Sequence, residues 1–172
     1  MTLARPLVDF LEKGTERMSQ RVLKALLSIA LVCGFAIQAS AATTKPVIAQ
    51  ASGQIVSQEF CSATEVCQVA VVTGSATQLG AFVGVLNEKV DITTGNYTGT
   101  ATFTTTNGDT ISTEYTGFVT PPNQQGRVFF VEDHTVTSGT GRFANATGNL
   151  NVIGTADALG RIQIVGVGSL TR

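Results

Sequence analysis

The sequence predicts an all-β protein, a small antiparallel closed barrel of about eight strands. From residue 53 onward, apolar and polar residues alternate with a period of two, and no helical apolar period of useful length occurs. Clusters of glycine, asparagine and aspartate separate these runs at short intervals, as turns between antiparallel strands do. Glycines also lie inside the runs, where strongly coiled strands need kinks, and this favours a barrel over the alternative of an open sandwich.

The expected strands follow from this alternation. The clearest is 97–106, where threonines at every second position form one face and Ala101 and Phe103 lie on the other. In the run 81–90, Phe82 and Glu88 share a face. The expected strands are 54–60, 66–73, 81–90, 97–106, 110–120, 128–136, 150–156 and 162–170.

Asn107-Gly108 predicts a hairpin between two of these strands. In a two-residue type I′ turn both central residues need a positive φ, and Asn-Gly is the pair that adopts it best.

Residues 1–41 resemble a secretory signal peptide that is removed. Arg21 and Lys24 precede an apolar block at 25–37, and the small residues at 39–41 form a cleavage pattern. A membrane helix needs ~20 apolar residues, so a retained anchor is the less favoured alternative. Translation that begins at Met18 would give a more ordinary signal. We therefore expect a secreted or periplasmic protein.

The rest of the chain divides into a flexible leader at 42–52, where Pro46 argues against a helix, and a single β-barrel domain at 53–172. The full chain has 11 Lys and Arg against 12 Asp and Glu, for a net charge of −1. Because the cations form no patch, we expect neither a nucleic-acid partner nor, after signal cleavage, a membrane partner.

Cys61 and Cys67 lie close together in the sequence. In an oxidising compartment nearby thiols usually pair, so we expect a disulfide, with free or metal-ligating thiols as the alternative. A zinc site needs four ligands, and the chain has a single histidine. We expect no metal and no cofactor, since no nucleotide-binding or metal-binding motif is present.

Four side chains are catalytic candidates. Glu132 and His134 would point the same way from a strand and could perform acid-base chemistry, although a polar cluster at a barrel mouth is favoured. Burial would raise the pKa of Glu88 and let it protonate a ligand, but a strand-end carboxylate in water near Lys89 is favoured. Tyr115 could orient a ligand with its hydroxyl, or simply pack in the core.

Three segments in this order resemble secreted bacterial proteins with an allene oxide cyclase barrel-like fold: 74–80, the hairpin 107–109, and Gly139-Thr140-Gly141-Arg142-Phe143 with 146–148. The last segment is also similar to a corner in plant dirigent proteins. This resemblance implies an eight-stranded barrel, a homotrimer, and an apolar cavity that in the plant enzymes steers cyclisation or radical coupling. The catalytic motif of the plant cyclase is missing, so no catalytic residue carries over. In the corner, we expect Phe143 to form a plug and Arg142 to hydrogen-bond carbonyl groups.

We therefore expect a secreted small β-barrel protein without a recognisable catalytic motif, which binds a small apolar ligand in the barrel or fills its interior with side chains. One alternative is a cyclase or isomerase of the allene oxide cyclase or dirigent type. Another is a structural surface protein that uses the threonine-rich exterior. Enzymatic activity stays open, and the sequence favours its absence.

Overall fold

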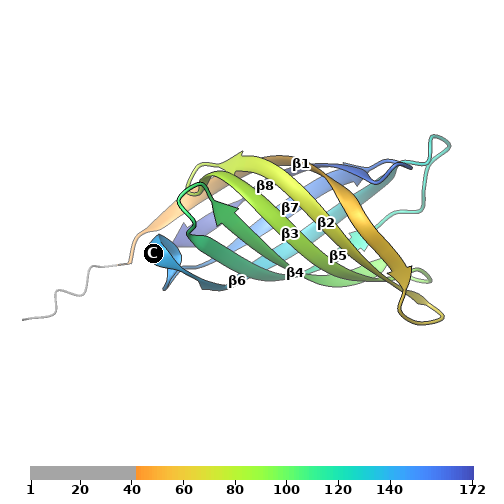
Figure 1. Ribbon diagram of the computed structural model, residues 1–172, viewed down its shortest axis with the longest axis horizontal. Coiled ribbons are helices and arrows are strands. Elements are labelled where there is room, and N and C mark those ends of the chain that lie inside the picture. The colour runs from red at the N-terminus through yellow and green to blue at the C-terminus, as the bar shows by residue number, and fades with distance from the viewer. Residues whose placement is uncertain (1–41) are drawn as a thin grey trace, which may run out of the picture. The chain divides into compact units, whose positions relative to one another are not determined.

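A computed structural model describes residues 42–172, and the predicted signal peptide lies outside the described residues. The described chain forms eight antiparallel strands, and β1 pairs with β8 to close a barrel (Figure 1). The predicted all-β closed barrel is thus confirmed, and an open sandwich is excluded. The elements are β1 (Thr44–Phe60), β2 (Glu65–Ala76), β3 (Gly80–Asp91), β4 (Asn96–Thr105), β5 (Thr110–Val119), β6 (Val128–Gly139), the 3-10 turn η1 (Gly141–Phe143), β7 (Thr147–Ala156) and β8 (Arg161–Thr171).

The expectation of a flexible leader at 42–52 is wrong, because β1 already begins at Thr44. Residues 44–54 pair with β8, and Val47 and Ala49 are buried inside the barrel. The segment contains few strong strand formers, so its local propensity is low. Its partner Thr171 lies 127 residues further along the chain than Thr44, and this distant pairing decides its conformation.

The connections between strands meet at two ends of the barrel. The disulfide end carries the connections 61–64, 92–95, 120–127 and 157–160, and the Phe143 end carries the connections 77–79, 106–109 and 140–146. Adjacent strands run antiparallel, so every second connection returns to the same end.

Phe143 fills the Phe143 end, where its side chain has no exposed surface. The Arg142 guanidinium lies 4.8 Å from the Phe143 ring centroid and donates a 2.6 Å hydrogen bond to the Leu79 carbonyl. Arg142 also lies 3.6 Å from the Asp109 carboxylate. Leu79, Asp109 and Arg142 lie in the connections that precede β3, β5 and β7. The contacts of Arg142 therefore link these three connections to one another at the Phe143 end of the barrel.

The hairpin predicted at Asn107-Gly108 joins β4 to β5, but its turn is not type I′. Gly108 has a φ of 85°, whereas no residue other than glycine in the described chain has a positive φ. The Thr105 amide donates to the Asp109 carbonyl and the Gly108 amide to the Thr105 carbonyl, each at 2.9 Å. This pattern fits a three-residue loop with glycine in the left-handed position, which needs only one positive φ.

Inside the barrel, glycines lie directly opposite aromatic residues on the neighbouring strand. At each such pair a Cβ on the glycine would lie under 3.0 Å from the facing ring, so the missing side chain makes room for the ring. The pairs are Gly84 with Phe103, Gly99 with Tyr115, Gly117 with Tyr97, and Gly154 with Phe130.

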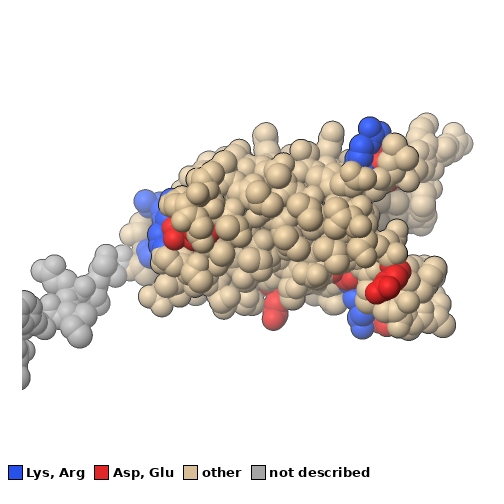
Figure 2. Space-filling view, viewed as in Figure 1, with Lys and Arg blue, Asp and Glu red and all other residues tan. Residues whose placement is uncertain are grey.

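The outer face of β4 carries the exposed threonines that the alternation predicted, while Ala101 and Thr105 are buried on the inner face. Figure 2 shows that the charged side chains of the visible face gather mostly toward the two ends. An exposed apolar row also crosses β5 to β8 through directly paired residues, namely Phe118, Val131, Ile153 and Val165. The homotrimer that the resemblance implies stays a prediction.

Candidate functional site

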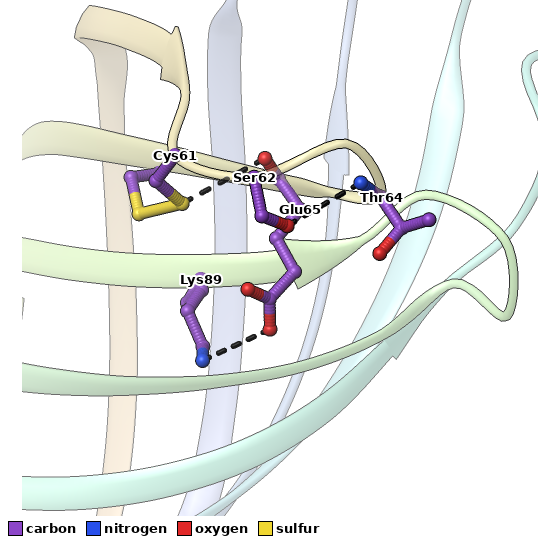
Figure 3. The surroundings of a disulfide bond; sticks show 6 residues. Cys61, Ser62, Thr64, Glu65 and Lys89 are labelled. Carbon is purple, nitrogen blue, oxygen red and sulfur yellow. Dashed lines mark hydrogen bonds and ion pairs between the residues drawn. A yellow bond between two sulfur atoms is a disulfide. The ribbon is translucent and has the colours of Figure 1, made fainter.

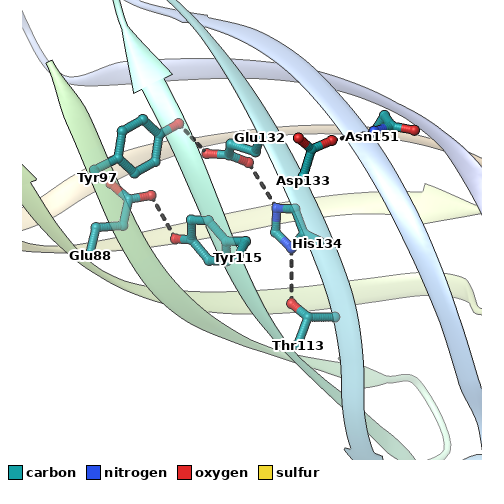
Figure 4. A network of polar contacts seen from close by, with 8 residues as sticks. All are labelled: Glu88, Tyr97, Thr113, Tyr115, Glu132, Asp133, His134 and Asn151. Carbon is teal, nitrogen blue, oxygen red and sulfur yellow. Dashed lines mark hydrogen bonds and ion pairs between the residues drawn. The ribbon is translucent and has the colours of Figure 1, made fainter.

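A buried carboxylate and imidazole lie side by side on β6. Glu132 and His134 are each 4% exposed, and His134 Nε2 lies 2.9 Å from Glu132 Oε2 (Figure 4). Thr113 Oγ1 on β5 lies 2.9 Å from the other ring nitrogen, His134 Nδ1. The Tyr97 hydroxyl on β4 donates a 2.8 Å hydrogen bond to Glu132 Oε1. Three strands therefore hold the carboxylate and the ring in one orientation.

A second carboxylate, the half-buried Glu88, faces the same interior from β3. The Tyr115 hydroxyl donates a 2.8 Å hydrogen bond to Glu88 Oε1, and the Gln68 amide donates to Glu88 Oε2. The Tyr115 ring stacks on the His134 ring at 4.2 Å between centroids, which connects this carboxylate to the pair on β6 (Figure 4). Within the described chain, no buried side-chain nitrogen or oxygen lacks a hydrogen-bond partner.

Burial dominates the acid-base behaviour of this network. It raises the pKa of Glu88, and the charge of Glu132 raises it further, while hydrogen bonds from Gln68 and Tyr115 act in the opposite direction. Burial also raises the pKa of Tyr97 and of Tyr115, with the nearby carboxylates adding to the effect. Both tyrosines therefore stay protonated and act as hydrogen-bond donors.

Two cavities lie on either side of this polar layer. The disulfide-end cavity has a volume of about 280 Å³, and Gln68, Glu88, Tyr97 and Glu132 form much of its polar wall. Its apolar walls include Ile55, Val66, Val90, Val128, Phe130 and Ile162.

The inner cavity, toward the Phe143 end, has a volume of about 80 Å³. Its wall is apolar apart from a few groups such as Thr113, Glu132 and His134. Glu132 lines both cavities, so it lies between them. Small-molecule pockets usually measure about 300 to 1,000 Å³, so the disulfide-end cavity approaches that range and the inner cavity does not.

The structure brings all four sequence candidates together in the barrel interior. Glu132, His134 and Tyr115 are buried, and Glu88 is half-buried. The expectation that Glu88 lies in water near Lys89 is wrong, because successive residues of a strand point to opposite faces and only Lys89 points outward.

Tyr97 and Gln68 also belong to the network, although neither is among the candidates predicted from the sequence. Tyr97 shares the inner face of β4 with Ala101, so the period of two was sufficient to place it inside. Gln68 gave no comparable signal, since its contact with Glu88 depends on the register between β2 and β3.

The disulfide between Cys61 and Cys67 is confirmed, with the two Cα atoms 5.7 Å apart. It closes the connection between β1 and β2 (Figure 3). Cys61 Sγ also contacts the Glu65 carbonyl, and the Glu65 carboxylate pairs with Lys89 at 2.9 Å. The disulfide thus fixes a turn beside the disulfide-end cavity.

Among residues 42–172, no three His, Cys, Asp or Glu side chains gather in a way that could hold a metal ion. In the same part of the chain, no helix is long and apolar enough to span a membrane.

No protein-family model matches the sequence, and no curated protein matches it. Among solved structures, the chain is similar to a pterocarpan synthase dirigent protein at 13% sequence identity and a TM-score of 0.48. The alignment covers 78% of this chain and 88% of that chain. Dirigent proteins are one of the two groups that the sequence resembles, and the barrel itself is established by the strand pairing of this chain.

Proposed function

We propose that this protein binds one small, largely apolar molecule in the disulfide-end cavity. The observation that carries the proposal is an apolar cavity of about 280 Å³ with Glu88 on its wall. Ligand pockets commonly combine mostly apolar walls with a few polar groups that fix the ligand's orientation. Tyr115 and Gln68 hold the two Glu88 oxygens in place, so this polar group is preorganised.

A methyl NMR titration with 2-phenylethanol tests the proposal. Binding in the disulfide-end cavity should shift the methyl signals of Ile55, Val66 and Ile162, which line it. The methyl signals of Ile153 and Val165 serve as controls, since both side chains are exposed on the outer face. Shifts confined to the controls, or no saturable shift at all, would contradict binding in the cavity.

Native mass spectrometry of the purified protein adds a second test. A co-purified small molecule that is released on unfolding would support the proposal and identify the ligand. We also propose a secreted or periplasmic location, because a disulfide such as Cys61–Cys67 persists mainly in oxidising compartments.

A cyclase or isomerase is a second candidate function, and the burial of Glu88 is the observation that favours it. A carboxyl group with a raised pKa holds its proton closer to neutral pH and can donate it to a bound molecule. Glu132 lies on the same cavity wall, whereas His134 faces the inner cavity and would act only through Glu132.

Hydrogen exchange at carbon tests this second candidate. The co-purified molecule is incubated with the protein in D₂O and its mass is followed. Deuterium uptake that disappears in Glu88→Gln would support proton transfer by Glu88. A bound molecule that exchanges no carbon-bound hydrogen would contradict it.

A further inference from the structure

The charges around the disulfide-end cavity have one sign. The charged residues on its wall are Glu88, Glu132 and Asp157, and no Lys, Arg or His among the described residues lines it. Every Lys and Arg of the described chain is exposed, namely Lys45, Lys89, Arg127, Arg142, Arg161 and Arg172, and the buried His134 lines the inner cavity instead.

The three carboxylates differ in how fully their charge is matched. Glu132 lies against His134 inside the barrel. Asp157 pairs with Arg161 at 2.6 Å. Within the described part of the chain, Glu88 receives side-chain hydrogen bonds only from Gln68 and Tyr115, which are neutral donors.

No Lys or Arg among residues 42–172 forms an ion pair with Glu88, and the charge of His134, which lowers the pKa of Glu88, is the smallest of the effects on it. A carboxylate offers about four lone-pair positions, and the two hydrogen bonds to Glu88 leave positions for a further donor. An ion pair is stronger in an apolar cavity than in water, because the surroundings screen it less. The cost of burying this charge also raises the pKa of Glu88.

We propose that the disulfide-end cavity selects apolar molecules that carry a protonated amine and rejects those that carry a carboxylate. This inference rests on the proposed function, since it names the class of molecule that the same cavity takes. An ammonium group would donate to Glu88 while its apolar body contacts side chains such as Ile55 and Phe130. A carboxylate in the same place would add a further negative charge beside Glu88 and Glu132.

Three probes of similar size and different charge test the selection: 2-phenylethylamine, 2-phenylethanol and 3-phenylpropionate. Their dissociation constants are measured by methyl NMR at neutral pH and constant ionic strength. We expect the amine to bind at least about tenfold more tightly than the carboxylate, with the alcohol between them. Equal binding of amine and carboxylate, or tighter binding of the carboxylate, would overturn the inference.

The three probes also separate this inference from the proposed function. If none of them shifts the methyl signals of the cavity, then binding itself fails. If the alcohol binds but the amine has no advantage over the carboxylate, then the binding proposal stands and only the selection fails.

Glu88→Gln assigns the selection to a residue. This change keeps the shape of the side chain and removes its charge, so the amine should lose most of its advantage over the carboxylate. Glu114→Gln is the matched control, because Glu114 is exposed on the outer face of β5 and should leave the preference unchanged. A preference that survives in Glu88→Gln, or that Glu114→Gln removes equally, would refute the role of Glu88.

Discussion

Replacing Gly117 with alanine should disrupt the barrel interior at a defined place. A Cβ at position 117 would lie 2.4 Å from Tyr97 Cζ and 2.7 Å from its hydroxyl oxygen, which no relaxed contact allows. The ring must move, and the hydrogen bond from Tyr97 to Glu132 then breaks. Overpacking of a core costs about 1 to 3 kcal/mol, and loss of a hydrogen bond to a charged group about 1.5 to 3 kcal/mol. We therefore expect Gly117→Ala to lower the free energy of unfolding by about 3 to 5 kcal/mol.

Urea unfolding followed by circular dichroism measures this loss. Tyr97→Leu provides the background that separates the clash from other effects, because it removes the ring that the new methyl group would meet. In that background, Gly117→Ala should cost less than about 1 kcal/mol more. A similar cost of Gly117→Ala in both backgrounds, or a loss near zero in the otherwise unchanged protein, would refute the pairing of glycine and ring.

Three further predictions concern stability. Burial raises the pKa of Glu88 above the ordinary value of 4.5, so the native state holds this proton to higher pH than the unfolded chain does. The free energy of unfolding should therefore fall as the pH rises above 4.5. Glu88→Gln should remove that part of the fall in urea titrations at several pH values; the same slope in both proteins would contradict it. Phe143→Ala should lower the free energy of unfolding by about 3 to 5 kcal/mol. Phe129→Ala is the control: this side chain is 51% exposed, and its loss should cost under about 1 kcal/mol. Similar losses in the two variants would refute the role of Phe143 as a plug. Cys61→Ser should cost about 2 kcal/mol by loss of a short closed loop, and dithiothreitol should destabilise the unchanged protein equally but leave the variant unaffected.

The sequence predicted the barrel because the evidence for each strand is local. Alternation on β4 places Ala101 and Thr105 inside and the threonines between them outside, and the structure agrees. The same rule placed Glu88 on the face of Phe82, which is the inner face.

The errors concern interactions between distant parts of the chain. The environment of Glu88 depends on Tyr115 and Gln68, which lie on other strands. The residues next to Glu88 in the sequence carry no information about these contacts, and they therefore favoured the wrong prediction that its carboxylate is exposed to water. The segment 44–52 forms a strand because β8 and β2 pair with it, although its own residues favour strand weakly. Which cavity each polar residue lines also depends on the stagger of the strands, and periodicity carries no information about that stagger.

The pairing of β1 with β8 sets the order in which this chain can fold. The hairpins from β2 to β8 join neighbours in the sequence, whereas Thr44 meets Thr171 across 127 residues. Closing so long a loop carries the largest entropic cost of any pairing in the barrel, so the seam between the first and last strands should form late. When the chain emerges from its N-terminus, as it does during synthesis, β1 can pair with β2 but lacks its second partner until β8 emerges. During that interval the unpaired edge of β1 is open to aggregation with other chains.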